Sequence, residues 1–578
     1  MPWDSDMETS LAPALIAGVE RVTAWADLLD DINVFPVADG DTGRNLVVSL
    51  SPLRQIAQGR ERIIREMLLS ARGNSGNIAA RFFSGLLMAD SVKNLAGAIL
   101  QGRDRAWQAV HDPKPGTMLT VFDALAAAVG EEPATYDALW RERILRRLEG
   151  VVHSTPELLP QLKAAGVVDA GALGVFIYLE GFLGSLTGNG EARRPVTEIF
   201  RDHLQISPDF REGDETGYCV DTVLHVGGDG ADTAKRLSAL GESVIVLRDG
   251  DCLKVHLHAR DGEKAREDLA GIGEVLRWSI DDLDLQVRAF GKRKVEQALH
   301  IMTDAAGSVN RQNTAELGVT ILGSYITLGE RCLPETHLAP EELYAAMRRG
   351  CKVSTSQASV YERHQCYQSV LGRHSRVLYL CVGSVFTGNF AVATQWKRDN
   401  DPGDRFTVVD TGAASGRLGL LAVAAARLAR QSRDAEAVIR FARDGAERCQ
   451  EYVFLDKLQY LAAGGRLSRT GAFVGDVLHM KPVISPLADG ARKVGVVRDQ
   501  AGQLQFALEK LAGALTGKGK EFIMIEYTDN APWVTEKVLP EIARRHQEAE
   551  IILHPMSLTS GAHMGPGAWA VAFLPAGE

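Results

Sequence analysis

Two aspartates separated by one glycine form the clearest chemical feature of this 578-residue sequence. They are Asp39 and Asp41, within NVFPVADGDTGRN at residues 33–45. Two carboxylates at this spacing, in a loop before a helix, can share one or two hard cations, and Mg²⁺ prefers such ligands together with substrate phosphates. Since Asp and Thr also cap helices, a capping turn is the alternative interpretation. An EF-hand is excluded, because Arg44 and Leu50 stand where that loop needs Gly and Glu.

A second loop, ARGNSGN at residues 71–77, joins two predicted helices. Its glycines let the backbone approach a ligand closely, and the helix that follows offers free N–H groups to a phosphate. The segments PGT at 115–117 and VDAG at 168–171 precede two further helices. Each loop alone is typical of the residues that precede a helix, but together the four can form a shared phosphate and metal site. No Walker-type loop occurs, so a nucleotide site would not be of the P-loop kind.

Two histidines alternate on a predicted strand in KVHLH, residues 254–258. Side chains two residues apart on a strand point to the same face, so His256 and His258 could supply two ligands to one metal ion. Zn²⁺ would need a third ligand, typically a thiolate. Both Cys219, on an earlier strand, and Cys252, on the same face of the same strand, are candidates. The alternative interpretation is two half-buried surface histidines.

Small polar residues follow several predicted strands in the C-terminal half. Ligands of open parallel sheets bind beyond the carboxyl ends of the strands. Hydroxyls, one arginine and one histidine suit a carboxylate ligand better than a metal. For any single Ser or Thr, loop capping is the alternative. The segments are TDAAGS (303–308), STSQAS (354–359), GSVFTGN (383–389), DTG (410–412), GGR (464–466) and GAHMGPG (561–567).

The elements that position these residues fall into three blocks. Residues 10–184 show helix-like apolar spacing with short loops, which predicts an all-α domain. Residues 218–287 read as a small α/β layer with strands at 219–226, 243–247 and 253–258 and helices at 232–240 and 262–271. Residues 300–578 alternate strands and helices, which predicts two α/β lobes with mainly parallel sheets. Gly-rich or charged stretches at 185–217 and 288–296 are predicted linkers or surface loops.

The overall composition excludes several classes of protein. Apolar residues make up 45% and charged residues 24% of the chain, which indicates a globular protein. With 64 basic and 74 acidic side chains the net charge is −10, which argues against a nucleic-acid partner. No apolar run approaches the ~20 residues of a membrane span, and the N-terminus does not resemble a secretory signal. Since seven cysteines fit a reducing compartment, a cytoplasmic location is predicted.

The motifs NVFPVADGDTGRN, ARGNSG, PGT and VVDAG occur in an order that resembles the DhaL-type (dihydroxyacetone-kinase-like) nucleotide domain of bacterial fatty acid kinases. The resemblance covers about residues 10–185. It implies an eight-helix barrel that binds ATP at one end through two Mg²⁺, with Asp39 and Asp41 as metal ligands. Arg44 stands where the family usually has a small polar residue. The other residues implied at the nucleotide are Asn33, Thr42, Asn45, Asn74, Ser75, Gly76, Thr117 and Asp169.

The sequence GYC followed by LKVHLH resembles the middle domain of the same kinase. That domain carries Cys and His-x-His residues associated with zinc. The resemblance therefore favours Cys219, His256 and His258 as Zn²⁺ ligands, with Cys252 as the competing thiol.

The C-terminal half resembles the DegV family. TDAAGS, TSQAS, VGSVFTGN, VVDTGAASG, LAAGGRLS and HMGPGA occur in the family's order across about residues 300–575, although Ala358 replaces the usual Pro and Thr387-Gly388-Asn389 the usual Ser-Gly-Thr. Members of that family are two-lobed α/β proteins that bury an acyl chain and hold its carboxylate at the lobe interface. The implied substrate-binding residues are Thr355, Ser356, Ser384, Thr387, Gly388, Arg466 and His563.

Taken together, these features predict a multidomain chain with an all-α DhaL-like domain at 1–195, a small α/β middle domain at 210–290 and a two-lobed α/β DegV-like domain at 297–578. The predicted function is that of a fatty acid kinase with kinase and acyl carrier in one chain. The alternatives are a dihydroxyacetone-type small-molecule kinase and a non-enzymatic lipid-binding sensor or transfer protein. The expected cofactors are ATP, two Mg²⁺ and Zn²⁺. The expected partners are a fatty acid, a membrane contacted transiently during lipid exchange, and a second copy in a homodimer. The predicted catalytic residues are Asp39, Asp41, Arg466 and His563.

Overall fold

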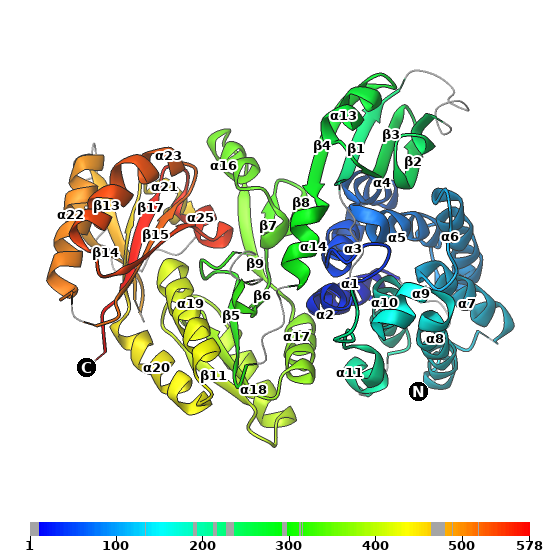
Figure 1. The fold of residues 1–578 in the computed structure, drawn as a ribbon, viewed down its shortest axis with the longest axis horizontal. Coiled ribbons are helices and arrows are strands. Elements are labelled where there is room, and N and C mark those ends of the chain that lie inside the picture. Colours follow the sequence, from blue (N-terminus) through cyan, green and yellow to red (C-terminus); the bar gives the residue numbers. More distant parts are fainter. Residues whose placement is uncertain are drawn as a thin grey trace, which may run out of the picture. The chain divides into compact units, whose positions relative to one another are not determined.

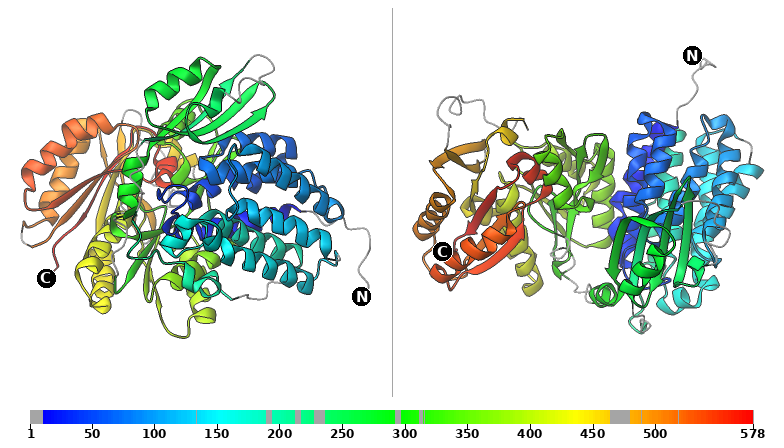
Figure 2. Two further views of the ribbon diagram at one scale, coloured as in Figure 1. Left: turned by 45° about the vertical axis from the view of Figure 1, so that its right-hand side comes forward. Right: turned by 90° about the horizontal axis from the view of Figure 1, so that it is seen from above.

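The computed structural model divides the chain into two compact units, Met1–Lys292 and Arg293–Glu578. Figures 1 and 2 trace the helices and strands of each unit. No helix within the described part of the chain is long and apolar enough to cross a membrane. The described residues are 11–132, 134–188, 194–211, 217–226, 236–291, 297–310, 314, 316–463, 480–487, 489–517 and 519–577.

The first unit begins with a helical region whose helix starts follow sequence signals. The side chains of Thr117, Asp137 and Asp169 each accept a hydrogen bond from a first-turn N–H, at 3.4, 2.8 and 2.7 Å. Each therefore satisfies one of the amides that a helix N-terminus leaves unpaired. The helices are α1 (Ala12–Ala24), α2 (Ala26–Asp31), α3 (Thr42–Leu50), α4 (Arg60–Ser70), α5 (Gly73–Leu86), α6 (Leu95–Ala109), α7 (Met118–Glu131), α8 (Ala138–Leu158), α9 (Pro160–Ala165), α10 (Ala170–Leu186) and α11 (Val196–Ile199), with 3₁₀ turns η1 (Ser51–Gln58), η2 (Val92–Asn94) and η3 (Arg201–His203).

Helix α10 lies at the centre of the helical region. Its residues from Ala170 to Leu183 are all buried, as expected of a helix that is apolar all round. Small residues let neighbouring helices approach it closely. A Cβ at Gly181 would lie 2.6 Å from the Ala17 carbonyl oxygen, and one at Gly174 would overlap the Leu46 side chain. Helices α1 and α3 therefore pack directly on α10.

A four-stranded antiparallel sheet completes the first unit. Strand β2 contacts α5 and α6, and its residues Ile245 and Leu247 belong to the same hydrophobic core as the helical region. Figure 2 shows the sheet packed over the helices. The sheet therefore shares a core with the helices that precede it. The strands, in the order β2-β3-β1-β4, are β1 (Tyr218–His225), β2 (Glu242–Asp249), β3 (Cys252–Ala259) and β4 (Glu274–Asp282), accompanied by α13 (Gly262–Ala270) and α14 (Leu283–Gly291).

Strand β4 is not anticipated by the sequence analysis, whereas β1, β2 and β3 match the predicted strands. The segment EVLRWSIDD contains four charged residues and is only partly buried at the edge of the sheet. An edge strand needs no regular apolar alternation, so periodicity alone does not reveal it. A helix predicted at 232–240 lies partly outside the described residues.

The described residues of the second unit form three sheets. A parallel sheet has the order β11-β10-β5-β6, a short antiparallel sheet β8-β7-β9, and a six-stranded sheet β14-β13-β12-β17-β15-β16. The strands are β5 (His300–Asp304), β6 (Val319–Leu322), β7 (Ser324–Leu328), β8 (Arg331–Pro334), β9 (Val353–Gln357), β10 (Val377–Cys381), β11 (Phe406–Asp410), β12 (Gln450–Phe454), β13 (Lys481–Leu487), β14 (Gly490–Val497), β15 (Phe522–Tyr527), β16 (Glu550–Pro555) and β17 (Trp569–Leu574).

Helix α19 lies between the parallel sheet and the six-stranded sheet. It contacts β5 on one side and β15 and β17 on the other, and one hydrophobic core includes residues of all these elements. The two lobes of this unit are therefore joined by a shared core. The helices are α16 (Pro340–Arg348), α17 (Val360–Arg373), α18 (Asn389–Asn400), α19 (Ser415–Gln431), α20 (Ala435–Arg448), α21 (Gln459–Ala463), α22 (Gln500–Ala514), α23 (Ala531–Trp533), α24 (Leu539–Arg545) and α25 (Leu558–Met564), with a 3₁₀ turn η4 (Glu335–His337) and a π-helical turn η5 (Val534–Val538).

The expectation of mainly parallel sheets is wrong for the six-stranded sheet. Within the described strands of this sheet, only β15 and β16 pair in parallel. The connection from β13 to β14 spans only residues 488–489, and so short a link can join only antiparallel strands. The parallel expectation holds for the sheet of β5, β6, β10 and β11.

Gly43 provides a test of the contact between α2 and α3. A Cβ at this position would overlap the Ala26 carbonyl oxygen, which is backbone and cannot move independently. We expect Gly43→Ala to cost about 1–3 kcal/mol and to lower the melting temperature measured by calorimetry. Gly97→Ala in α6 is the control, because nothing lies within 4 Å of the added Cβ. The control should melt at or above the wild-type temperature, and an unchanged Gly43→Ala would contradict this account.

Candidate functional site

The aspartate loop between α2 and α3 is built around Asn33. The Asn33 amide donates a hydrogen bond to an Asp39 oxygen at 2.5 Å, and the Thr42 hydroxyl donates to the Asn33 carbonyl oxygen at 2.7 Å. Asp41 is 8% exposed, whereas Asp39 is partly exposed. The structure thus brings together four residues that the sequence assigned to one metal and nucleotide site.

The two carboxylates of this loop repel each other. Burial raises the pKa of Asp39 well above its ordinary value, and Asp41 raises it further, while Arg44 offsets part of the shift. The Arg44 guanidinium lies 3.4 Å from Asp41. A divalent cation would relieve this repulsion, and paired carboxylate oxygens are ligands that Mg²⁺ prefers. Asp39 and Asp41 therefore fit a magnesium site.

Asp30 is a third carboxylate near this loop that the sequence analysis did not identify. It accepts hydrogen bonds from the N–H groups of Gly43 at 2.7 Å and Arg44 at 3.2 Å, so it caps α3 from the end of α2. Its charge also contributes to the raised pKa of Asp39. An aspartate at the end of a helix carries no signal of its own, and only the fold places it here.

The glycine loop lies directly against α3. A Cβ at Gly73 would overlap the Asn45 side chain, and Gly73 has a φ of +60°, which favours glycine. A Cβ at Gly76 would overlap the Ser49 side chain, whose hydroxyl accepts a hydrogen bond from the Arg72 N–H at 3.1 Å. The fold therefore places Asn45 beside the start of α5, where Asn74, Ser75 and Gly76 lie.

Thr117 and Asp169 lie at the starts of two neighbouring helices. A Cβ at Gly171 would lie 2.8 Å from the Met118 side chain, so the starts of α7 and α10 are close together. Burial raises the pKa of Asp169 to about 7, against hydrogen bonds from backbone amides of α10. The contacts described above for Thr117 and Asp169 are those of helix caps, and a role for them at the nucleotide stays a prediction.

The pairing of β1 with β3 brings one cysteine and two histidines together. Cys219 stands opposite His258, and the candidate ligand atoms of Cys219, His256 and His258 all lie within 4.8 Å of one another. Cys252 pairs with His225 at the other end of the two strands. The strand register therefore favours Cys219 over Cys252 as the thiol of the cluster.

The chemistry of this cluster fits zinc. The Nε2 atom of His256 is buried, and none of the described residues forms a hydrogen bond with it. Burial lowers the pKa of His258 to about 3, with His256 adding to the shift, so the ring is neutral near pH 7. Burial also raises the pKa of Cys219 well above its ordinary value, so metal binding would release a proton. One thiolate and two neutral imidazoles leave zinc a fourth position.

Asp221 connects this cluster to the glycine loop and is a second residue that the sequence analysis missed. It accepts hydrogen bonds from the Gly73 N–H at 3.0 Å and the Asn77 amide at 3.3 Å. It also pairs with Lys254 at 2.7 Å and His256 at 3.3 Å. Although burial opposes ionisation, Lys254 and His256 hold the pKa of Asp221 well below its ordinary value. No motif marks this residue, because its partners are distant in sequence.

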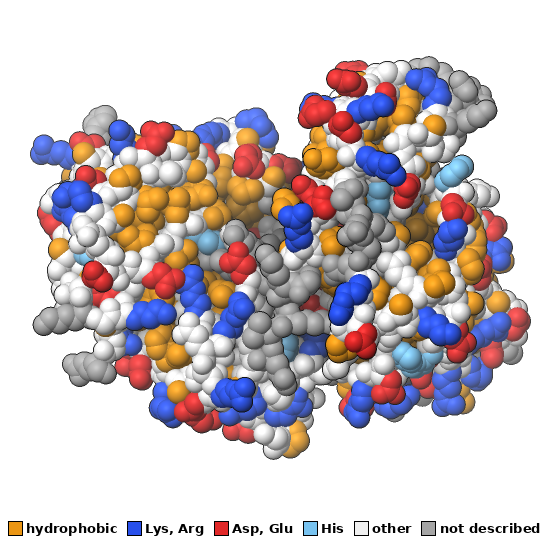
Figure 3. Space-filling model, in the orientation of Figure 1, with side chains coloured by type: hydrophobic (Ala, Val, Ile, Leu, Met, Phe, Trp, Pro, Cys, Tyr) orange, Lys and Arg blue, Asp and Glu red, His pale blue; other side chains and the backbone are white. Residues whose placement is uncertain are grey.

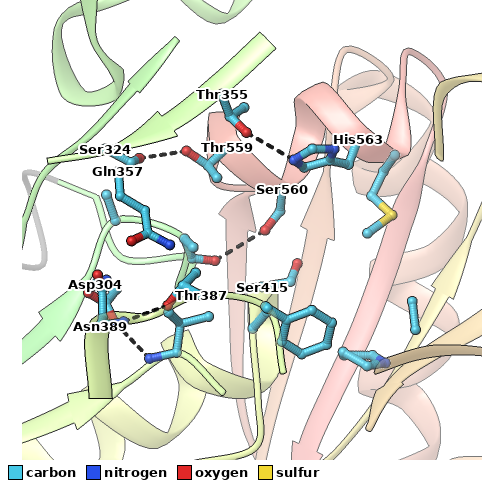
Figure 4. Close-up of a pocket in the computed structure, with 18 of the residues that line it drawn as sticks. Asp304, Ser324, Thr355, Gln357, Thr387, Asn389, Ser415, Thr559, Ser560 and His563 are labelled. Atoms are coloured by element: carbon cyan, nitrogen blue, oxygen red, sulfur yellow. Dashed lines mark hydrogen bonds between the residues drawn. The ribbon is translucent and has the colours of Figure 1, made fainter. Parts of the chain in front are cut away.

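The second unit encloses a cavity of about 360 Å³, within the size range of small-molecule sites. Two polar pairs lie at one side of it. The Thr355 hydroxyl lies 3.1 Å from His563 Nε2, and the Ser324 hydroxyl lies 2.6 Å from that of Thr559. Figure 4 shows both pairs joining strands β7 and β9 to helix α25. These hydroxyls and the imidazole form a site for a hydrogen-bonding headgroup.

Apolar side chains line the part of the cavity formed by the six-stranded sheet. Figure 3 shows hydrophobic side chains gathered on the face over β13 and α25. No described lining residue is Lys or Arg. The cavity therefore suits an amphipathic molecule with a polar headgroup and an apolar body. Its apolar lining includes Phe386, Val453, Leu461, Ile484, Pro486, Ala491 and Met564.

Asp304 forms a buried polar wall of this cavity. Its carboxylate accepts hydrogen bonds from the Tyr379 hydroxyl at 2.6 Å, the Val382 N–H at 2.6 Å and the Asn389 amide at 2.7 Å. The Arg363 guanidinium donates to the Asn389 carbonyl oxygen at 2.8 Å. Burial raises the pKa of Asp304 to about 6, although these hydrogen bonds lower it. The Asp304 carboxylate is therefore held by a network of hydrogen bonds rather than by a direct ion pair.

The cavity includes part of the predicted substrate site. Thr355, Ser356, Thr387 and His563 line it. Ser384 and Gly388 do not, because the loop after β10 exposes them. Arg466 lies outside the described residues. The sequence analysis did not assign Ser324, Asn389, Ser415, Thr559 and Ser560, which also line the cavity.

Three family models match the chain, each over one of these regions. The DAK2 domain model matches residues 36–184, and a model of the middle domain found in proteins like a fatty acid kinase subunit matches residues 215–290. The model of the DegV family, described as uncharacterised, matches residues 298–576. The chain thus combines a DhaL-like region, a middle domain like that of a fatty acid kinase subunit and a DegV-like region. This combination matches the architecture of a fatty acid kinase and confirms the predicted resemblance and fold class.

Several curated proteins are similar to part of the chain. Uncharacterized protein SSP1546 of Staphylococcus saprophyticus is 28% identical over 354 residues, which cover 57% of this chain and 63% of that protein. Protein YloV of Bacillus subtilis is 31% identical over 308 residues, which cover 47% of this chain and 55% of that protein. The chain therefore spans little more than half the length of these curated relatives.

Solved structures of DegV proteins align with about half of the chain. A structure titled for fatty acid binding of a DegV family protein from Thermus thermophilus is 22% identical and covers 48% of this chain and 99% of that one, with a TM-score of 0.44. DegV of Bacillus subtilis, described as a fatty acid binding protein, is 18% identical with the same coverage and TM-score.

The raised pKa of Asp304 predicts a pH-dependent contribution to stability. The folded state binds this proton more tightly than the unfolded state, so its contribution is full below about pH 4 and is lost as the pH rises to about 6. Relative to Asp304→Asn, which does not titrate, the wild type should lose on the order of 3 kcal/mol across this window. Melting temperatures of both proteins from pH 4 to 8 measure the difference. A wild type that gains stability relative to the variant as the pH rises would contradict the prediction.

Proposed function

We propose that this chain is a fatty acid kinase, which transfers the γ-phosphate of ATP to a fatty acid carboxylate and yields acyl phosphate and ADP. One observation carries the proposal: a paired-carboxylate loop beside a glycine loop and an amphipathic cavity occur in the same polypeptide. The paired-carboxylate loop and the glycine loop together suit a metal-bound triphosphate. The cavity suits a molecule with a polar headgroup and a long apolar body. The match to the middle domain of a fatty acid kinase supports the same assignment.

In the proposed reaction, residues of the first unit hold the nucleotide. Mg²⁺ bound by Asp39 and Asp41 would neutralise charge on the β and γ oxygens. Asn33 fixes the orientation of Asp39, and the N–H groups at the start of α5 hold phosphate oxygens. Arg44 adds positive charge beside Asp41. These residues position the γ-phosphorus and do not take part in bond formation.

The second unit presents the acceptor. Thr355 and His563 orient the carboxylate by hydrogen bonds, while the apolar lining takes the acyl chain. A fatty acid carboxylate is already ionised near pH 7, so no general base is required. One carboxylate oxygen forms a bond to the γ-phosphorus as the bond to the β–γ bridging oxygen breaks, and ADP leaves with that electron pair. Catalysis is then mainly positioning and electrostatic stabilisation.

When both sites lie on one chain, the effective concentration of one site at the other is set by the segment that connects them. A flexible linker gives an effective concentration of about millimolar, so docking of the carrier need not be tight. Transfer within one chain and transfer between two chains of a homodimer both satisfy this requirement. Transient contact with a membrane would allow the cavity to exchange its lipid.

An assay of ADP release with and without oleate tests the proposal. We expect oleate to stimulate ADP release, and Asp41→Ala to reduce the stimulated rate on the order of 10²-fold or more, because preorganised charge stabilisation is lost. Asp112→Ala, at an exposed surface site, is the matched control and should retain the rate. Release driven by dihydroxyacetone instead of oleate would indicate a small-molecule kinase. Lack of release with any lipid would indicate a lipid sensor or transfer protein.

Metal content tests the zinc assignment separately. We propose Cys219, His256 and His258 as the ligands, so the purified wild type should carry about one Zn²⁺ per chain in native mass spectrometry. Cys219→Ser should lose most of this metal, because the thiolate supplies one of three ligands. Cys252→Ser is the control and should retain it, since Cys252 lies at the far end of the strand pair. Equal zinc content in both variants would show that the site lies elsewhere.

A further inference from the structure

The start of the glycine loop is bound by a carboxylate from another domain. Asp221 on β1 accepts hydrogen bonds from the Gly73 N–H at 3.0 Å and the Asn77 amide at 3.3 Å, although 148 residues separate it from Gly73. The Asn77 amide also donates to the Gly73 carbonyl oxygen at 2.7 Å. Gly73, Asn77 and Asp221 are all buried. The conformation of the first turn of α5 therefore depends on the position of Asp221.

The same carboxylate also contacts the Cys/His cluster. Nδ1 of His256 lies 3.3 Å from Asp221, while Nε2 is buried and unpaired within the described part of the chain. The Nδ1 atom also lies 3.9 Å from Cys219 Sγ, so one edge of the His256 ring faces both Asp221 and the thiol of the cluster. A carboxylate that contacts a metal-binding histidine commonly fixes the orientation of the ring. Lys254, 2.7 Å from Asp221, balances its charge, so the carboxylate would not repel a phosphate held nearby.

We propose that Asp221 is a positioning residue that couples occupancy of the metal cluster to nucleotide binding at the glycine loop. With the cluster occupied, the His256 ring would be held beside Asp221, and Asp221 in turn holds Gly73 and Asn77. The remaining amides of the loop then keep the geometry that a phosphate requires. Because coupling between sites is reciprocal, nucleotide also strengthens metal retention. The proposal rests on the proposed function in one respect, that the 73–76 loop holds nucleotide phosphates.

The test measures nucleotide affinity of the full-length chain by calorimetry, with ADP and Mg²⁺ as the probe, in zinc-loaded and chelator-treated protein. We expect zinc removal to weaken ADP binding by the wild type about tenfold, the effect of losing one charge-assisted hydrogen bond. Asp221→Asn should bind ADP about tenfold more weakly in both states while retaining its zinc. Asp249→Asn, a partly exposed aspartate on β2, is the matched control and should behave as the wild type.

A second measurement needs no variant. Hydrogen exchange of the peptide that spans residues 73–77 should become faster in the wild type when zinc is removed, because the Gly73 N–H loses its fixed acceptor. Unchanged exchange together with unchanged ADP affinity would overturn the coupling. Asp221→Asn with wild-type ADP affinity and normal oleate-dependent ADP release would overturn this inference alone. Absence of ADP binding by the zinc-loaded wild type would overturn the proposed function as well.

Discussion

Concentrated negative charge is the constraint on which the first unit depends. Asp30 and Asp41 act on Asp39, and the charges of Asp39, Asp41, Asp221 and Asp281 all raise the pKa of the Cys219 thiol. The acidic loop and the Cys/His cluster therefore lie close enough to act on each other electrostatically. Such an arrangement is unfavourable without cations, so ligands that bind the folded state contribute to its stability. Asp39 therefore costs stability in the free protein and supplies affinity for cations in return, whereas the charge of Asp221 is balanced by Lys254.

The described lining of the cavity in the second unit includes one carboxylate, that of Asp304. The cavity offers hydroxyls and one imidazole, while the buried Asp304 is satisfied by Tyr379, Val382 and Asn389. A separate hydrophobic cluster includes Ile326 of β7 and Leu558 of α25, with Val353 of β9 packed against it, so the polar residues of these elements keep fixed positions. Closed networks of this kind avoid the large cost of leaving a buried polar group unpaired.

Much of the fold could be predicted from the sequence, because helix caps and apolar periodicity are local signals. Thr117 and Asp169 mark helix starts, and strands β5, β10, β11, β15 and β16 follow apolar runs. Strand β4 and the antiparallel pairing of the six-stranded sheet could not be predicted, since an edge strand and a sheet order depend on distant partners. The same reason explains the site residues. Asp39 and Asp41 stand in a recognisable motif, whereas Asp30, Asp221 and Ser324 acquire their positions only through contacts between separate elements.

The contrast between the two units bears on how the proposed reaction would be accelerated. A carboxylate paired with Lys or Arg is stabilised in the ground state, and stabilisation of the reactant alone raises the barrier to its attack on phosphorus. The described lining of the cavity includes no Lys or Arg and offers hydroxyls and an imidazole, which would orient the carboxylate without pairing it with a fixed positive charge. Negative charge that develops on the phosphoryl group would be stabilised in the first unit, where Asp39 and Asp41 suit a divalent cation. In the proposed reaction, orientation of the nucleophile and stabilisation of the transferring group would thus be the work of different domains.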